Sequence, residues 1–489
     1  MTVSLKSKFL YQLSVSLLFS IAPVITFPYV SRVLGPENIG RINFIDYACQ
    51  FLILLASFGI PYYGVREIAK AGKDIKRISL LISELTFIHV LITLFSITIF
   101  SVLIFFQPAQ SSDKELIALA AINILANAFG LEWMIHGLED FKFLARRSFL
   151  VKIISLAAIF ILIRSSSDYL NYYLILIAGN VAILIIDLLY VLKKKIGFIR
   201  PQNIRKHLKP LSLFFLTTVS LSLYTFFDTV ILGIISGTLA VGFYTTGLKI
   251  LRLSQNLIND IGSVMLPRVS FLIEKGEKSE INRIINKSLQ YIITIAIPFG
   301  TFIFLASHEI ISLLAGEKFL ASVAILQLLS VLPLIAGLTN LFFLQVLLPH
   351  GKEKIILAGL ILGSLVSIAS NIILCPIYGE RGAALSCIAA EISIALFLGL
   401  YSVKQVRFQM PWQTIGGSIS AALSFVPVIF LCQKLSGNPL IVLITEGIFC
   451  LASFVLIQLL FRNNILREGI QFFFPQLKAK QAKASEFEA

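Results

Sequence analysis

Residues 9–31 read FLYQLSVSLLFSIAPVITFPYVS, and this stretch determines the fold class. It contains 23 consecutive positions without a charged side chain. An α-helix rises 1.5 Å per residue, so a run of about 20 apolar residues crosses the ~30 Å hydrocarbon core of a bilayer. The run follows Lys6 and Lys8, as a secretory signal would, but it is too long for a typical signal core and lacks a small-x-small cleavage site. The sequence therefore predicts a retained membrane helix.

Similar runs follow along the rest of the chain. Of its 489 residues, 57% are hydrophobic and 14% are charged, and the mean hydropathy is +0.89. Because so apolar a chain cannot dissolve as a globule, we expect an all-α polytopic membrane protein. About fourteen transmembrane helices are predicted, near residues 9–31, 39–63, 79–106, 115–136, 144–163, 170–192, 211–236, 242–266, 288–314, 322–348, 355–375, 383–403, 412–434 and 439–461. The five cysteines lie within or at the ends of these runs, so we expect buried apolar thiols and assign no disulfide.

The basic residues predict the topology. The net charge of +15 could suggest a nucleic-acid partner, but Lys and Arg concentrate in alternate loops, as they do in cytoplasmic loops of membrane proteins. With the N-terminus inside, the inner segments hold 31 of the 41 basic residues. Both termini are then cytoplasmic, and no nucleic-acid partner is expected. The stretch KKKIGFIRPQNIRKHLK at 193–209 is predicted to be a topology determinant and lobe linker, with an anionic-lipid site as the alternative.

An internal repeat divides the chain. Gly35 and Gly40, between the first two predicted helices, match Gly237 and Gly242 at an offset of 202 residues. Two further matches occur in the same order, 136–137 with 350–351 and 190–193 with 401–404. Six helices per repeat is an even number, so the lobes are predicted to be parallel repeats, an arrangement found in alternating-access carriers that bind substrate between lobes. Duplication that serves only packing is the alternative.

The repeat and the linker set the predicted domains. They are an N-terminal six-helix lobe (1–195), a cytoplasmic linker (196–209), a C-terminal six-helix lobe (210–405), two additional transmembrane helices (406–465) and a cytoplasmic tail (466–489).

Charged side chains inside predicted membrane helices mark candidate substrate sites, because a Lys or Arg at the bilayer centre costs roughly 2.5–3.5 kcal/mol. Lys249, Arg252 and Asn256 lie on one face of the eighth helix. Lys152 and Asn180, together with Arg32, Arg41 and Arg66 at the borders of the first two helices, complete the candidate substrate-binding set. The arginines guide an anionic head group or simply extend to the membrane surface, and both interpretations stay open.

Acidic residues at similar depth are candidates for ion coupling. These are Asp46, Asp228 and Glu391, of which Glu391 is the repeat equivalent of Asn180. The alternative for each charged residue is a structural ion pair, for example Asp46 with Lys249. That alternative is stronger for residues nearer the helix ends, namely Glu84, His89, Glu132 and Asp187.

No motif indicates catalysis. GPENIGRI at 35–42 has the spacing of a phosphate-binding loop, but Arg41 and Ile42 replace the required Lys and Ser or Thr. The five histidines are scattered, and no soluble segment is long enough for a catalytic domain. We expect no enzyme, no catalytic residue, no metal and no cofactor, with H⁺ or Na⁺ open as a coupling ion.

Two stretches resemble a known family. FPYVSRVLGPENIGRINFIDYACQFLILLASFGIPYYGVREIAK at 27–70 and HGLEDFKFLARRSFLVKIISL at 136–156 resemble the Wzx-type polysaccharide repeat-unit flippases of bacteria, members of the multidrug, oligosaccharidyl-lipid and polysaccharide exporter superfamily. The resemblance implies flipping of an undecaprenyl-pyrophosphate-linked oligosaccharide, for O-antigen, capsule or another glycan, to the outer leaflet of the cytoplasmic (inner) membrane. It also implies a polysaccharide polymerase and a chain-length regulator as partners, besides membrane lipids.

Lys249, Arg252 and Lys152 are the candidates for binding the pyrophosphate, because Arg holds phosphate oxygens bidentately and Lys holds them as a point charge. The resemblance does not itself fix these positions. A cation-coupled drug or metabolite antiporter of the same superfamily and a peptidoglycan-precursor flippase are the alternative functions. A membrane polymerase or ligase of sugar chains is not expected, because no long outer loop is present.

Overall fold

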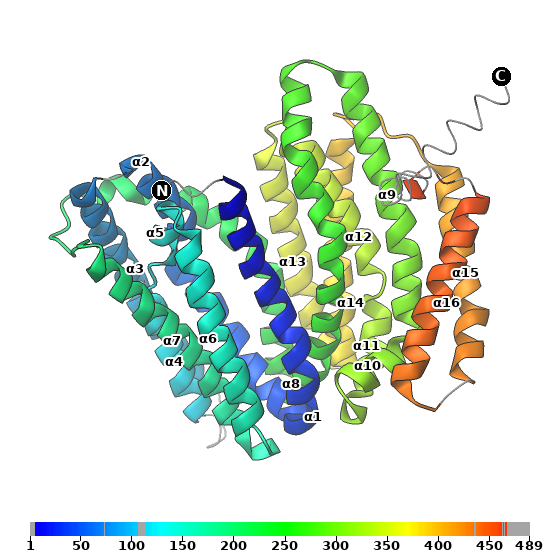
Figure 1. Cartoon of the computed structure of the whole chain (residues 1–489), viewed down its shortest axis with the longest axis horizontal. Helices are drawn as coiled ribbons and strands as arrows, with labels where there is room; N and C mark the ends of the chain where they lie inside the picture. The colour runs from blue at the N-terminus through cyan, green and yellow to red at the C-terminus, as the bar shows by residue number, and fades with distance from the viewer. Residues whose placement is uncertain are drawn as a thin grey trace. The chain divides into compact units, whose positions relative to one another are not determined.

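The protein is described here from a computed structural model, which describes residues 5–72, 74–105, 114–434, 437–461, 463 and 465–466. Within these ranges the side chains of 5–20, 103–105, 213, 216–218, 220–225 and 253–264 are not described. The elements of the described residues are all helices (Figure 1). Packing divides them into two compact units, residues 1–245 with 371–383 and residues 246–370 with 384–489. The predicted six-helix lobes, with their linker at 196–209, rest on the sequence repeat and not on how the helices pack. They stay a prediction.

The first unit is built mainly from the N-terminal helices. They are α1 Leu5–Ser57, α2 Ile60–Ala71, α3 Ile75–Phe105, α4 Lys114–Asn127, α5 Glu132–Gly137, α6 Phe141–Leu162, the short 3₁₀ helix η2 Ser166–Asp168 and α7 Tyr169–Lys193. The first part of α8 Arg205–Glu274, up to Thr245, completes this unit with residues 371–383. Buried aliphatic and aromatic side chains of α2, α3 and α5 form a hydrophobic cluster in it.

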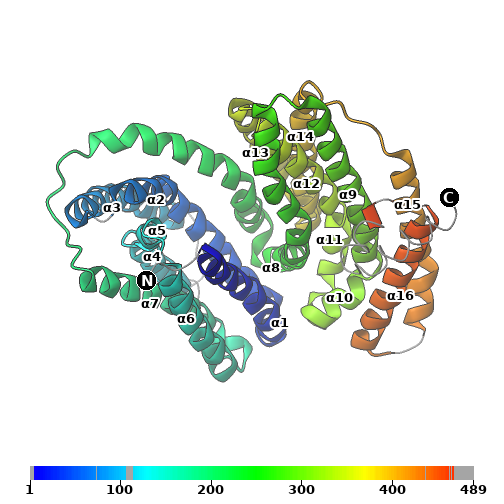
Figure 2. The same cartoon turned by 45° about the horizontal axis from the view of Figure 1, so that its top comes forward.

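The second unit holds the rest of α8 and the C-terminal helices. They are α9 Lys278–Leu305, α10 Ser307–Leu314, η3 Glu317–Phe319, α11 Ala321–Leu329, α12 Leu332–Asn340, the π-helix η4 Leu341–Leu347, α13 Glu353–Tyr378, α14 Glu380–Ser402, α15 Trp412–Gln433 and α16 Pro439–Leu460. The end of α13 from Asn371 and the start of α14 up to Ala383 belong to the first unit. Within this unit α15 and α16 lie side by side, and α15 packs on α9 (Figures 1 and 2).

The predicted fold class is confirmed, and each of the fourteen predicted helices overlaps a helix of the structure. Eleven helices among the described residues are long and apolar enough to cross a membrane. The difference from fourteen has two causes. First, α1 and α8 each cover two predicted helices. Second, α6 is not apolar enough to be counted, because Arg146, Arg147 and Lys152 interrupt its apolar sequence. Large apolar side chains such as Leu192 (66% exposed) and Leu460 (71% exposed) cover outer surfaces, which suits contact with lipid chains.

The predicted repeat has a direct structural counterpart in the two long helices. Gly35 interrupts α1 at φ 77° and ψ 171°, and Gly237 interrupts α8 at φ 84° and ψ 172°. This region of φ/ψ is open to glycine and strained for other residues. Both bends therefore depend on glycine, 202 residues apart.

The segments that follow these bends cross each other closely within the first unit. A Cβ on Gly40 would meet the backbone carbonyl of Thr238 and come within 2.8 Å of the Gly242 nitrogen. Conversely, a Cβ on Gly242 would meet the carbonyl of Pro36 and come within 3.3 Å of the Gly40 nitrogen. Because Pro36 and Thr238 are also 202 residues apart, the crossing is reciprocal. The two repeats thus contact each other through equivalent atoms, as a two-fold axis requires.

Each repeat also fixes an extended segment to its third helix. In the first unit Ser79 and Ser83 on α3 accept hydrogen bonds from the backbone nitrogens of Gly197 (3.2 Å) and Ile199 (2.8 Å). In the second unit the side-chain oxygens of the equivalent residues on α9, Asn282 and Asn286, accept from the backbone nitrogens of Arg407 (3.1 Å) and Gln409 (2.7 Å). The helix positions differ by 203 residues and the bound segments by 210. The repeat therefore extends to the segments that follow the sixth helix of each set.

Candidate functional site

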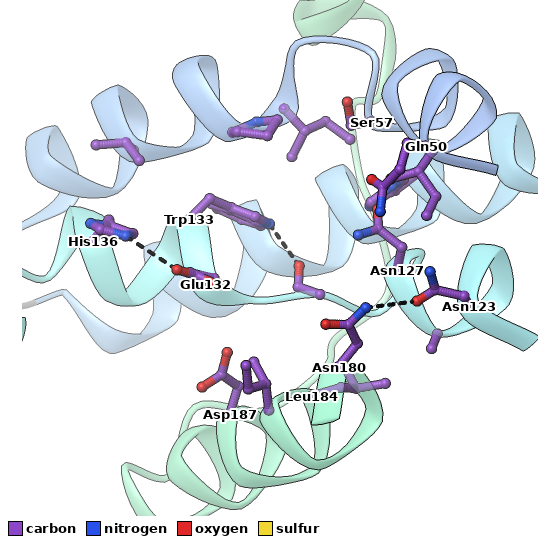
Figure 3. A pocket seen from close by; sticks show the side chains of 18 of the residues that line it. Gln50, Ser57, Asn123, Asn127, Glu132, Trp133, His136, Asn180, Leu184 and Asp187 are labelled. Atoms are coloured by element: carbon purple, nitrogen blue, oxygen red, sulfur yellow. Dashed lines mark hydrogen bonds and ion pairs between the residues drawn. The ribbon is translucent and has the colours of Figure 1, made fainter. Parts of the chain in front are cut away.

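The first unit contains a cavity of about 740 Å³ (Figure 3). Its lining comes from α1, α2, α3, α4, α5 and α7. Four neutral amide side chains contribute to this lining beside apolar side chains, namely Gln50, Asn123, Asn127 and Asn180. A mainly apolar cavity with a few polar groups is a candidate solute site.

The amide groups are held in fixed orientations. Asn180 on α7 donates from Nδ2 to Oδ1 of Asn123 on α4, at 3.2 Å. Asn123 in turn donates to the sulfur of Cys49 at 3.7 Å, and Asn123 itself is 4% exposed. Asn127 follows one helical turn after Asn123, so both lie on one face of α4. Each amide offers donors and an acceptor, which suits a ligand with many hydroxyl groups.

An indole ring is fixed beside the amides. Trp133 on α5 donates from Nε1 to the carbonyl oxygen of Gly130 at 3.0 Å. Its ring lies flat against Gly64 of α2, where a Cβ would come within 2.8 Å of ring atom Cζ3. The close approach therefore requires glycine at this position. Since Gly130 lies in the break between α4 and α5, that break presents the ring to the cavity.

On the opposite side of the cavity, acidic and basic side chains pair with one another. Asp187 on α7 lies 2.5 Å from Arg147 of α6, and both side chains are 1% exposed. Arg147 also contacts Glu132 of α5 at 3.3 Å, and Glu132 lies 3.5 Å from His136. Figure 3 shows Glu132 and His136 on the side away from Asn123 and Asn180. Among the described residues that line the cavity there is no lysine or arginine.

Asp187 and Glu132 both pair with Arg147. A structural ion pair was the stronger alternative for these two residues because they lie nearer the helix ends. Arg147 falls inside the predicted helix at 144–163, and in the structure it lies within α6 and is buried. The helix begins three residues earlier than predicted, at Phe141, where Asp140 accepts a hydrogen bond from the Phe143 nitrogen at 3.2 Å.

Of the predicted substrate-binding residues, Asn180 lines this cavity, and the others in the first unit lie elsewhere. Lys152 is half-buried on α6, and Arg32 is exposed on α1. Arg41 contacts Glu37 at 2.7 Å. Arg66 contacts Glu67 at 3.1 Å and lies 5.2 Å above the Tyr63 ring. The roles predicted for these cations stay predictions.

Lys249 and Arg252 are half-buried on the part of α8 that belongs to the second unit. The Asn256 side chain lies outside the described residues. The substrate-binding role predicted for Lys249, Arg252 and Asn256 therefore stays a prediction.

The three predicted ion-coupling carboxylates have separate surroundings. Asp46 on α1 accepts a hydrogen bond from the Tyr173 hydroxyl at 3.4 Å. Asp228 on α8 is 3% exposed and accepts from Nδ2 of Asn371 at 2.8 Å and from the Tyr244 hydroxyl at 3.4 Å. Glu391 is half-buried on α14 in the second unit. Their coupling role stays a prediction.

Sequence reasoning missed Gln50, Asn123 and Asn127 as site residues. The signal was present but weak, because two asparagines four residues apart in an apolar helix form a polar face without any charge.

Long apolar helices around an internal cavity with polar groups are typical of a multi-pass membrane transporter. The chain belongs to the family described as "Polysaccharide biosynthesis protein", which matches residues 5–273. A protein of Escherichia coli (strain K12) named "Putative O-antigen transporter" is 26% identical over 377 residues, which are 76% of this chain and 89% of the relative. The relatives that carry functional names are transporters and flippases.

Two solved structures share the fold. The structure titled "Lipid II flippase MurJ, inward closed conformation" matches with a TM-score of 0.65 at 18% identity, over 94% of this chain and all of that chain. An inward-facing multidrug resistance MATE family transporter of the MOP superfamily matches with a TM-score of 0.65 at 14% identity, over 79% of this chain and 94% of that chain. Identities this low establish the common architecture alone.

Proposed function

We propose that the protein flips undecaprenyl-pyrophosphate-linked oligosaccharide repeat units from the inner to the outer leaflet of a bacterial cytoplasmic membrane by alternating access, with both termini in the cytoplasm. The observation that carries the proposal is the amide-lined cavity within membrane helices of a polysaccharide biosynthesis family member. The relative in Escherichia coli, named as an O-antigen transporter, supports the substrate class.

The sugar part of the substrate suits the amide cavity. Its volume of about 740 Å³ lies within the roughly 300–1,000 Å³ of ligand pockets. Amide groups pair with sugar hydroxyls as donor and acceptor together, and the Trp133 ring adds an apolar face for the carbon–hydrogen side of a sugar ring. Because no lysine or arginine is among the described lining residues, the pyrophosphate is assigned to other side chains.

Lys249, Arg252 and Lys152 are the proposed pyrophosphate ligands. Arg binds phosphate oxygens in a fork, and Lys binds as a mobile point charge. Moving about two negative charges outward in an inside-negative membrane is favourable by roughly 2.3 kcal/mol per charge per 100 mV. The membrane potential therefore supports the proposed direction, and H⁺ or Na⁺ at Asp46, Asp228 or Glu391 would serve to reset the empty carrier.

The prenyl chain suits an apolar groove of about 210 Å³ in the second unit. Its lining is almost wholly apolar and includes Pro298 and Phe302 on α9, Phe425 on α15 and Phe454 on α16. An isoprenoid chain gains by leaving water for such a surface, at about 25 cal/mol per Å². A polysaccharide polymerase and a chain-length regulator are the proposed partners that take over the flipped unit.

Complementation tests this function. The wild-type gene is expressed in a bacterium that lacks its own repeat-unit flippase, and surface polysaccharide is scored. We expect the wild type to restore the glycan and the double variant Asn123→Leu/Asn180→Leu to fail at equal protein abundance. Asn171→Ala, an exposed asparagine on α7 outside the cavity lining, serves as the matched control. Failure of the wild type across several hosts would favour the antiporter or peptidoglycan-precursor alternatives instead.

A further inference from the structure

A buried carboxyl group lies near the start of the last helix, far in sequence from every predicted site. Glu446 is the eighth residue of α16 and is 0% exposed. Neither of its carboxylate oxygens has a hydrogen-bond partner among the described residues. An unpaired charged carboxylate in an apolar interior is strongly unfavourable, and such a group takes up a proton instead.

A second carboxyl group faces the same interior. Glu309 lies on α10, which packs against α16, and it is 8% exposed. Its Oε1 accepts a hydrogen bond from Nε2 of Gln433 at 3.1 Å, whereas Oε2 has no partner within the described part of the chain. Glu309 lies within electrostatic range of Glu446, and two like charges so placed oppose each other.

The other ionisable groups around the pair do not neutralise Glu446. The half of α9 that leads to α10, residues 295–305, contains no ionisable side chain. His308 lies 4.0 Å from Glu309 and is 61% exposed, and the Lys434 ammonium lies 4.3 Å from the Phe430 ring centre. The remaining ionisable neighbours on the elements packed here are Glu317 and Lys318 on η3, Cys432 on α15 and Cys450 on α16.

We propose that Glu446 and Glu309 form a proton-binding site, in which Glu446 carries the proton and Glu309 keeps the negative charge. A proton fits this pair better than a metal ion does. The described residues contain no group of three or more His, Cys, Asp or Glu side chains that could hold a metal, and a hard cation takes about six oxygen ligands. A carboxyl group needs no further ligand once it is protonated, because the neutral acid no longer carries the charge that makes its burial unfavourable.

The site differs from the coupling carboxylates predicted from sequence, and it does not depend on the proposed substrate. It lies on α10, α15 and α16, and the last two of these helices come from outside the two six-helix repeats. Loss of the proton would place two negative charges between α10 and α16, so protonation stabilises the packing of the last helix against the second unit.

Infrared spectroscopy of the full-length protein in zwitterionic lipid vesicles tests the proposal. At neutral pH the wild type should show a C=O stretching band of a neutral carboxylic acid that is absent in Glu446→Gln. Glu353→Gln, at an exposed position, should keep the band. In Glu309→Gln the pH at which the band disappears should fall by about one unit or more, because the opposing charge is gone.

Equal wild-type and Glu446→Gln spectra at neutral pH would overturn the proposal. So would an unchanged titration in Glu309→Gln, since Glu309 would then not be the partner. Both glutamine variants keep the shape of the native side chain, and their fold is checked by gel filtration before spectra are compared.

Discussion

Removing the buried cation beside the amide cavity should destabilise the first unit strongly. Arg147 and Asp187 lie 2.5 Å apart, and each side chain is 1% exposed. Replacing one partner of such a pair leaves an uncompensated buried charge and costs about 3–5 kcal/mol. The contact with Glu132 adds little, at most about 1 kcal/mol, because Glu132 is 52% exposed. We therefore expect Arg147→Met to lower the melting temperature by on the order of 10 °C.

A double-mutant cycle separates the charge from the packing. Arg147→Met/Asp187→Leu replaces the pair with apolar groups of similar size, and such replacements are often neutral or stabilising. The double variant should thus recover most of the stability lost in Arg147→Met. The assay is thermal unfolding in detergent, followed by tryptophan fluorescence, because Trp133 lies next to Glu132 in the affected region. The reasoning is wrong if the single variant is as stable as the wild type, or if the double variant is as unstable as the single one.

Three further predictions follow from other parts of the structure. Gly242→Ala should lower the melting temperature more than Gly447→Ala. Both glycines lie inside helices, but a Cβ on Gly242 would meet a backbone carbonyl, whereas a Cβ on Gly447 would meet nothing within 4 Å; equal effects would contradict the close crossing. Glu84→Ala should speed proteolysis of the segment between α7 and α8, because Glu84 accepts from two of its backbone nitrogens, and an unchanged cleavage rate would count against that anchoring. Neutralising Lys249 and Arg252 together should abolish surface glycan in the complementation assay at normal protein abundance, and full activity of that variant would remove them as pyrophosphate ligands.

The membrane fold could be predicted because its signals are local. Apolar runs of the right length determine where helices lie whatever their neighbours are. The bends at Gly35 and Gly237 also have a local signal in the sequence. Glycine at matching repeat positions indicates a shared backbone conformation. The five cysteines are buried, as predicted from their place in apolar runs.

The amide cavity could not be predicted because it depends on which helices become neighbours. Asn123 and Asn180 are 57 residues apart in sequence, and neither carries a charge that would draw attention. The charge pattern instead favoured Lys249 and Arg252, which lie in the other unit. Likewise the buried pair of Arg147 and Asp187 could not be predicted, because its members are 40 residues apart in sequence. Side-chain pairing is a property of packing, and sequence periodicity reports only the helix face.

The two repeats have kept their backbone contacts while their side chains diverged. Ser79 and Ser83 correspond to Asn282 and Asn286, and each pair holds an extended segment through equivalent hydrogen bonds. The next residue breaks the symmetry, because Glu84 in the first repeat corresponds to a lysine 203 residues later. Glu84 is buried, pairs with His207 and Lys206 and accepts two backbone hydrogen bonds from the linker. Its counterpart Lys287 is exposed and lines a polar cavity of about 390 Å³.

This asymmetry follows from what each extended segment connects. The first segment leads into α8, a long helix that is shared between the two compact units. A charge-assisted network of buried groups holds its start more firmly than neutral bonds alone would. The second segment leads only to α15 and α16, which pack within the second unit. The charged network thus lies at the start of the helix that both units share, and neutral amide contacts hold the segment that leads to α15 and α16.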